Sequence, residues 1–159
     1  MGKRVRRDGT SAGRDAVRMS RETERVLEEI ARRYHLSLVM LFGSHAADLS
    51  TSESDMDIAV LTERPDRITS LAYHLDLGAE LSKCLQTGEI DLAFLNNADP
   101  LLRAEVARRG RILFEKDDAF AHFAVRAMKE FEDARQYRFR ILREVLEDFY
   151  GSAARKHPA

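Results

Sequence analysis

Two aspartates, Asp55 and Asp57, stand two residues apart at the head of an apolar run, 58–61. Residues two apart in a strand point to the same face of a sheet, so this spacing predicts two adjacent carboxylates. Adjacent like charges repel each other, and each loses hydration when it is buried. A divalent cation between the carboxylates offsets both costs, and Mg²⁺ prefers such oxygen ligands. The pair therefore predicts a metal site.

A glycine and a serine, Gly43 and Ser44, end the preceding apolar run, and ten residues separate Ser44 from Asp55. Glycine lets a phosphate approach the backbone closely. The amides at the start of a following turn, together with a serine hydroxyl, can hold phosphate oxygens. We therefore expect Gly43 and Ser44 to bind the phosphates of a nucleotide beside the metal.

A third aspartate, Asp91, is the sole charge between Ile90 and Leu92 in another apolar run. On its own, such a residue is often a solvated aspartate at the edge of a sheet. Beside Asp55 and Asp57, it can instead complete a site for one or two Mg²⁺ ions. Two ions held in this way stabilise both the attacking and the leaving oxygen of a phosphoryl displacement.

The elements that must position these residues are strands alternating with helices. The pattern predicts a single α/β (α+β) domain, with a mixed sheet of three to four strands and a long C-terminal helix. Ser20 is expected to cap the first helix. Strands are expected at 36–42, 55–61, 89–95 and 111–115, and helices at 21–34, 65–86, 100–109 and 118–149.

The domain is expected to occupy residues 20–150. Residues 1–19 are basic and rich in glycine, which predicts a flexible basic N-terminal tail. Such a tail can contact RNA or an acidic partner, or it can be only solvated. We favour the solvated tail and therefore expect no direct nucleic-acid binding. Residues 151–159 are expected to form a flexible C-terminal tail.

Composition excludes several classes of protein. The chain has 159 residues, 44% of them hydrophobic, and a net charge of −1, which is typical of one globular domain. No apolar run is long enough to span a membrane. Cys84 is the only cysteine, so an internal disulfide and a multi-cysteine zinc site are both excluded, and we expect it to be a buried helix residue. A cytoplasmic protein fits these properties.

The last helix has more apolar residues than one domain needs. Phe123 and Met128 are expected to pack on the sheet. Beyond Tyr137 the apolar residues spread over more than one helical face, so part of the helix is expected to contact another chain. Partner docking and homodimerisation both fit. The residues concerned are Phe139, Ile141, Leu142, Val145, Leu146, Phe149 and Tyr150.

The joint spacing of Gly43-Ser44, ten residues and Asp55-Met56-Asp57 resembles the signature of the DNA polymerase β-like nucleotidyltransferase superfamily. Over residues 20–150 the chain is most similar to the minimal nucleotidyltransferases (MNT), the antitoxin partners of HEPN-domain toxins. The likeness includes the strand around Asp91 and the segment 100–115.

The resemblance implies transfer of AMP from ATP to a tyrosine hydroxyl of a HEPN toxin, an RNase, which silences the toxin. It implies that Asp55, Asp57 and Asp91 are the catalytic, Mg²⁺-binding residues, and that Asp91 can act as a base on the acceptor. Gly43 and Ser44 match the pair that holds the phosphates.

The chain departs from the family at two positions. His45 stands where many members have arginine, and no glycine occurs near Asp48 or Leu49. His45 either donates to a phosphate when protonated or is a bystander on the turn. These departures affect phosphate affinity more than the metal site.

Two alternative functions follow from the departures and from the chain length. One is a binding module that neutralises the toxin by covering it, with weak or absent catalysis. The other is a nucleotidyltransferase acting on a small molecule, although the chain leaves little room for a substrate domain.

Overall fold

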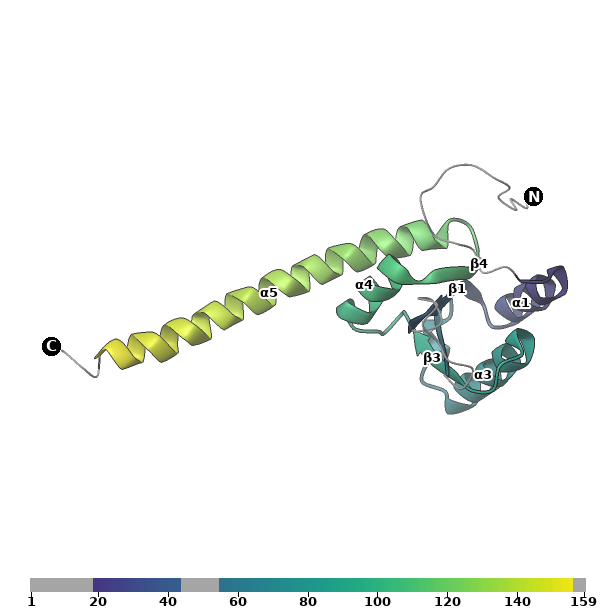
Figure 1. Ribbon diagram of the computed structural model, residues 1–159, viewed down its shortest axis with the longest axis horizontal. Helices are drawn as coiled ribbons and strands as arrows, with labels where there is room; N and C mark the ends of the chain where they lie inside the picture. The colour runs from purple at the N-terminus through teal and green to yellow at the C-terminus, as the bar shows by residue number, and fades with distance from the viewer. Residues whose placement is uncertain (1–18, 44–54, 156–159) are drawn as a thin grey trace.

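A mixed sheet of four strands forms the centre of the protein. The computed structural model describes residues 19–43 and 55–155, with side chains described as far as residue 147. The strand order is β3-β2-β1-β4, where β1 is antiparallel to both β2 and β4, and β2 is parallel to β3 (Figure 1). This confirms the predicted fold class. The strands are β1 (Leu36–Phe42), β2 (Met56–Thr62), β3 (Ile90–Phe94) and β4 (Arg111–Glu115).

Helices cover both faces of the sheet (Figure 1). On one side, α1 (Arg21–Arg33) and α3 (Leu71–Leu85) pack over Ile58 and Val60, and we call this side the α1/α3 face. On the other, α4 (Pro100–Arg109) and the first turns of α5 (Ala119–Arg155) pack over Ala59, and we call it the α4/α5 face. Successive residues of β2 therefore alternate between two separate cores.

Side-chain caps begin α1 and α4, and the cap of α1 is the one predicted at Ser20. The Ser20 hydroxyl accepts a hydrogen bond from the backbone N–H of Thr23 at 3.1 Å. The Asp99 carboxylate accepts from the backbone N–H groups of Leu101 and Leu102, at 2.8 and 3.0 Å. Each cap satisfies amides that have no partner within the first helical turn.

The predicted helix 65–86 is divided in two, which corrects the expectation. A short 3-10 helix, η1, spans Pro65–Arg67, and α3 begins only after Ser70, whose hydroxyl accepts from the N–H of Tyr73 at 3.3 Å. Leu71 and Leu75, in the first turns of α3, are 72% and 62% exposed although both are apolar. The serine competes for the backbone and restarts the helix with a different face toward the core.

The last helix is longer than predicted. α5 ends at Arg155, so it includes residues 151–155, which were expected to belong to the C-terminal tail. A single glycine costs a helix only about 1 kcal/mol relative to alanine, so Gly151 does not stop it. The rest of the two predicted tails, residues 1–18 and 156–159, lies outside the described residues.

The first turns of α5 are fixed to α4 and the sheet. Phe123 and Ala127 are buried in the core of the α4/α5 face, as predicted for Phe123, whereas Met128 is exposed. Arg103 of α4 pairs with Glu130, and its guanidinium lies 5.8 Å from the centre of the Phe123 ring. These contacts set the direction in which the rest of α5 extends.

A polar cluster joins α1 to α3 at the rim of the other face. The Arg33 guanidinium donates to both oxygens of Glu80, at 2.7 and 2.6 Å, and the Tyr34 hydroxyl donates to Glu80 at 3.0 Å. Burial, and then the Glu80 carboxylate, raise the pKa of Tyr34 to about 12.

Among the described residues, no helix is both long enough and apolar enough to cross a membrane.

Candidate functional site

Three of the predicted site residues meet at one edge of the sheet. β1 ends at this edge with Phe42, and β2 and β3 begin there. Phe42 pairs with Asp57 across β1 and β2, and Asp57 pairs with Asp91 across β2 and β3. Gly43, which follows Phe42 directly, therefore lies at the same edge as both aspartates.

Asp57 and Asp91 point to the same face of the sheet. Their neighbours Met56 and Ile90 pack into the core of the α1/α3 face, so the two aspartates face the α4/α5 side. Neighbouring strands lie about 4.8 Å apart, which makes residues in register close neighbours. Asp57 is half-buried and Asp91 is exposed. The pair of carboxylates thus opens toward solvent at the end of the sheet.

Gly43 lies directly against the Asp57 carboxylate. Gly43 has a φ of +68°, and a Cβ built on it would lie 2.1 Å from Asp57 Oδ2 and 2.8 Å from Asp57 Cγ. Any other residue here would meet both a left-handed backbone and a direct collision. The Asp57 carboxylate therefore fills the space that a Cβ would need, which explains why this position is glycine.

Asp55 stands immediately before β2 and is exposed. Over residues 19–43 and 55–155, no three acidic, histidine or cysteine side chains gather closely enough to enclose a metal ion. The structure thus brings Asp57 and Asp91 together in register but does not collect Asp55 into one group with them. The donor set itself consists of carboxylate oxygens, which are the ligands that Mg²⁺ prefers.

The remaining predicted site residues, Ser44 and His45, lie outside the described residues, so their roles stay predictions. One residue at the edge was not singled out from the sequence. Arg111 begins β4 directly opposite Leu41, two residues before Gly43, and is half-buried. The signal for it was a basic residue between Gly110 and an apolar run, beside the strand that ends in glycine.

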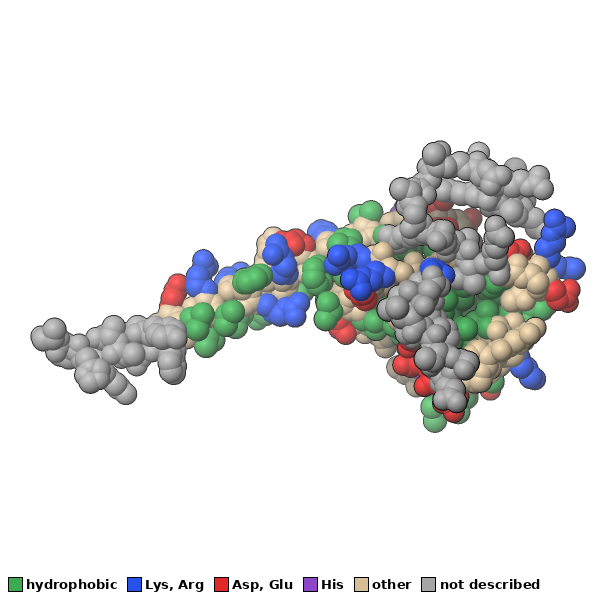
Figure 2. Space-filling model, in the orientation of Figure 1, with side chains coloured by type: hydrophobic (Ala, Val, Ile, Leu, Met, Phe, Trp, Pro, Cys, Tyr) green, Lys and Arg blue, Asp and Glu red, His purple; other side chains and the backbone are tan. Residues whose placement is uncertain are grey.

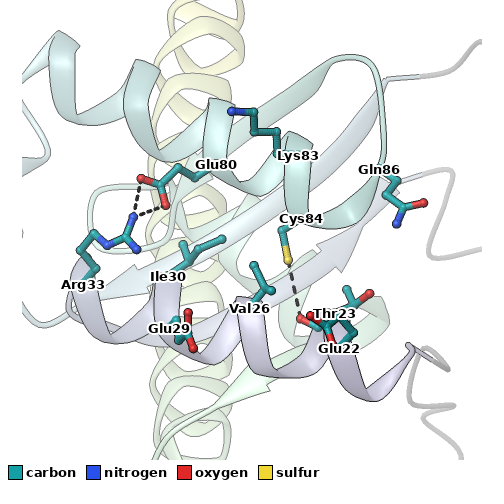
Figure 3. Close-up of a pocket in the computed structure, with 10 residues that line it drawn as sticks. All are labelled: Glu22, Thr23, Val26, Glu29, Ile30, Arg33, Glu80, Lys83, Cys84 and Gln86. Atoms are coloured by element: carbon teal, nitrogen blue, oxygen red, sulfur yellow. Dashed lines mark hydrogen bonds and ion pairs between the residues drawn. The ribbon is translucent and has the colours of Figure 1, made fainter.

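A cavity of about 460 Å³ lies elsewhere, between α1 and α3 (Figure 3). It is on the α1/α3 side, away from the Asp57 and Asp91 carboxylates, so we do not assign the site to it. Cys84 lies in its wall, as expected of a buried helix residue, and its thiol contacts the Thr23 carbonyl at 3.7 Å. Burial raises the pKa of the Cys84 thiol, which disfavours the reactive thiolate.

Comparison with protein families gives a match over the part of the chain that holds the site. The family model described as "Polymerase beta, Nucleotidyltransferase" matches residues 25–119, a range that contains every predicted site residue.

Individual relatives agree with this match. The chain is 30% identical over 124 residues to a protein named protein adenylyltransferase MntA from Shewanella oneidensis, covering 77% of this chain and 83% of that protein. A crystal structure described as the toxin–antitoxin with AMP-PNP superposes with a TM-score of 0.62 at 26% identity, covering 77% of this chain and 98% of its own.

A further solved structure contains a modified partner. It is described as a tri-AMPylated Shewanella oneidensis HEPN toxin in complex with the MNT antitoxin. The matched chain has a TM-score of 0.56 and 25% identity, covering 78% of this chain and 96% of its own.

Proposed function

The chain belongs to the polymerase beta nucleotidyltransferase family, and we propose that it is an antitoxin that transfers AMP from ATP to a tyrosine hydroxyl of a HEPN-domain toxin. The observation that supports this most directly is the register of Asp57 and Asp91, two carboxylates side by side at the edge where Gly43 ends β1. The similarity to MntA, a protein adenylyltransferase, supports the choice of reaction.

In the proposed reaction, the acceptor hydroxyl oxygen forms a bond to the α-phosphorus of ATP, and pyrophosphate leaves. Asp55, Asp57 and Asp91 would hold one or two Mg²⁺ ions, which supply positive charge against the triphosphate. The exposed Asp91 carboxylate accepts the proton of the acceptor hydroxyl. Gly43 and Ser44 hold the phosphates, and His45 is an additional donor when it is protonated. We propose a cytoplasmic location, where ATP is available.

The decisive experiment is the intact mass of the toxin. The cognate HEPN-domain toxin is incubated with this chain, ATP and Mg²⁺, and we expect a mass increase of one or more AMP units. Chelation of Mg²⁺ with EDTA abolishes the increase. Asp55→Asn combined with Asp57→Asn also abolishes it, because two of the three ligand carboxylates are lost.

The matched control is Asp76→Asn, which removes an exposed carboxylate from α3 on the α1/α3 side. This variant retains transfer at the wild-type rate. Unchanged labelling by the Asp55 and Asp57 double variant would show that the site is wrongly assigned.

A second candidate function is neutralisation by binding alone. Two observations favour it: His45 stands where many members have arginine, and the outer half of α5 exposes apolar side chains on which a partner could be bound. Under this hypothesis the Asp55 and Asp57 double variant still protects cells that express the toxin. Loss of protection while the complex persists would exclude it.

A further inference from the structure

We propose that the outer half of α5 is the surface on which the acceptor protein docks. It holds this protein against the edge of the sheet where Gly43, Asp57 and Asp91 lie, which we call the catalytic edge. This inference rests on the proposed function, because it names where the toxin sits during transfer. The surface, which we call the distal stripe, consists of Phe139, Ile141, Leu142, Val145 and Leu146.

The distal stripe is apolar and uncovered. Its five side chains are between 39% and 61% exposed, and they lie along the part of α5 that extends away from the sheet (Figures 1 and 2). Phe139, Leu142 and Leu146 follow one another at spacings of three and four residues, which aligns them along the helix. Together with Arg143 and Glu147 they line a shallow depression. A contiguous apolar surface of this kind marks a site of interaction with another protein.

The direction of α5 carries this surface past the catalytic edge. β4 is antiparallel to β1, so β4 begins at the edge where Gly43 lies and ends at the opposite edge. α5 follows β4 and returns across the α4/α5 face, where Phe123 and Ala127 pack against Leu38 and Met40. Its outer half therefore projects beyond the edge at which β1 ends (Figure 1).

The distal stripe also continues the face of α5 that is buried in the domain. In a helix with about 100° per residue, Ile141 and Val145 follow Phe123 and Ala127 after about five whole turns, and Phe123 and Ala127 are the residues of α5 that are buried in the domain. Asp57 and Asp91 point to the same side of the sheet as α5. A protein seated on the distal stripe thus lies on the same side of the sheet as these carboxylates, which favours the acceptor over an unrelated partner.

One charged residue beside the distal stripe indicates the chemistry of the partner. Arg138 lies one turn before Ile141 and Leu142 on the same side of the helix, and in the described part of the chain it has no carboxylate at ion-pair distance. If a second copy of this chain docked in parallel, its own Arg138 would lie beside this one, where the like charges repel. The acceptor is therefore expected to present an apolar helix face with a carboxylate near Arg138.

The first test uses Leu142→Glu and Leu146→Glu as separate variants. Binding of the cognate HEPN toxin is measured by calorimetry, and ATP binding is measured in parallel. Each variant is expected to weaken toxin binding by roughly tenfold to a hundredfold, because a leucine that the bound toxin would bury is replaced by a charge. ATP affinity and helix content are expected to stay unchanged. The matched control is Val125→Glu, the same kind of change at a residue of α5 that is 73% exposed and lies off the stripe.

The second test concerns Arg138. Arg138→Glu is expected to weaken toxin binding by about tenfold or more, whereas Arg140→Glu, the same charge reversal, is expected to have less than about a threefold effect. Arg140 lies on another side of the helix, with its guanidinium 5.3 Å from the centre of the Tyr137 ring. Equal effects of the two reversals would overturn the expected carboxylate contact.

The outcomes separate docking from catalysis. Unchanged toxin affinity in both leucine variants would overturn the docking surface, even if the wild-type protein transfers AMP. A wild-type dimer that Leu142→Glu converts to monomer, with toxin affinity unaffected, would assign the stripe to a second copy and also overturn it. Conversely, loss of toxin binding in the leucine variants of a protein that never transfers AMP would support docking and refute the proposed function.

Discussion

At the scale of single residues, the contact between Gly43 and Asp57 constrains the site most. The Gly43 backbone is left-handed, and the Asp57 carboxylate occupies the space of a Cβ. In Gly43→Ala, we expect a cost of roughly 1–2 kcal/mol from the backbone conformation, together with displacement of the carboxylate. Transfer of AMP is expected to fall by about a hundredfold, as displacements near 1 Å do in active sites.

Intact-mass kinetics and urea unfolding measure the two effects of Gly43→Ala separately. Gly88→Ala is the control, since nothing lies within 4 Å of the position of its Cβ. A Gly43→Ala protein with wild-type transfer would mean that Asp57 does not act from the position described.

Tyr34 gives a prediction about pH. Its pKa is raised from 10.0 to about 12 in the folded protein, chiefly by burial. Between these values the unfolded chain has released the proton and the folded protein has kept it, so stability falls as pH rises through this range. The contribution is fully present below pH 10. Tyr34→Phe is expected to show a smaller fall in the free energy of unfolding over this range, measured by urea titrations at successive pH values. An identical fall in both proteins would contradict the assignment.

The sequence predicts some of these residue-level features and not others. Asp57 and Asp91 could be placed on one sheet face because the period of a strand fixes which side each residue takes. Their exact pairing across β2 and β3 depends on strand order and register, which a single pattern does not encode. Likewise, the collision that requires Gly43 exists only once β1 and β2 have paired.

At the scale of elements, local signals predicted the strands better than the helix faces. All four strands were expected within one residue of their observed ends, because Gly, Pro and polar runs border them. The helix at 65–86 was predicted as one element because its apolar residues recur, yet Ser70 starts a new helix whose buried residues are Leu77, Leu81 and Cys84. Whether a serine interrupts a helix depends on tertiary packing as well as on propensity.

The anchoring of α5 can be tested by a matched pair of substitutions. Phe123 is 3% exposed and packs under α4, whereas Phe139 is 61% exposed. We expect Phe123→Ala to lower the free energy of unfolding by about 3–5 kcal/mol, since it leaves a cavity in the core. Phe139→Ala is expected to change it by less than about 0.5 kcal/mol. Urea denaturation followed by circular dichroism measures both.

Similar losses in the two phenylalanine variants would contradict this division of α5. They would mean that the outer half of the helix contributes to the stability of the domain.

At the scale of the whole molecule, the protein consists of a compact domain and one projecting helix (Figure 1). Residues 135–147 are all exposed. A chain ending at residue 134 is therefore expected to keep its thermal midpoint within about 4 °C and its affinity for ATP, while losing measurable affinity for the toxin. Differential scanning calorimetry and isothermal titration check the two halves of this prediction. A truncated chain that fails to fold would show that the outer half supports the domain.

The apolar excess of α5 was visible in the sequence, because its hydrophobic residues exceed one helical face. Its projection was not, since the direction of the helix depends on the turn after β4 and on the pairing of Arg103 with Glu130. The length of the helix was underestimated for a local reason, the single glycine at 151.

Because α5 is one continuous helix, the distal stripe has a fixed rotation about the helix axis relative to the residues of α5 that pack on the domain. An insertion of one residue between Phe131 and Phe139 would rotate the distal stripe about the helix axis by about 100°, so that it no longer faces the same side as the catalytic edge. An insertion of seven would restore the orientation to within about 20° and move the outer half by about 10 Å. Toxin binding is therefore expected to survive only those insertions whose length is close to a whole number of helical turns.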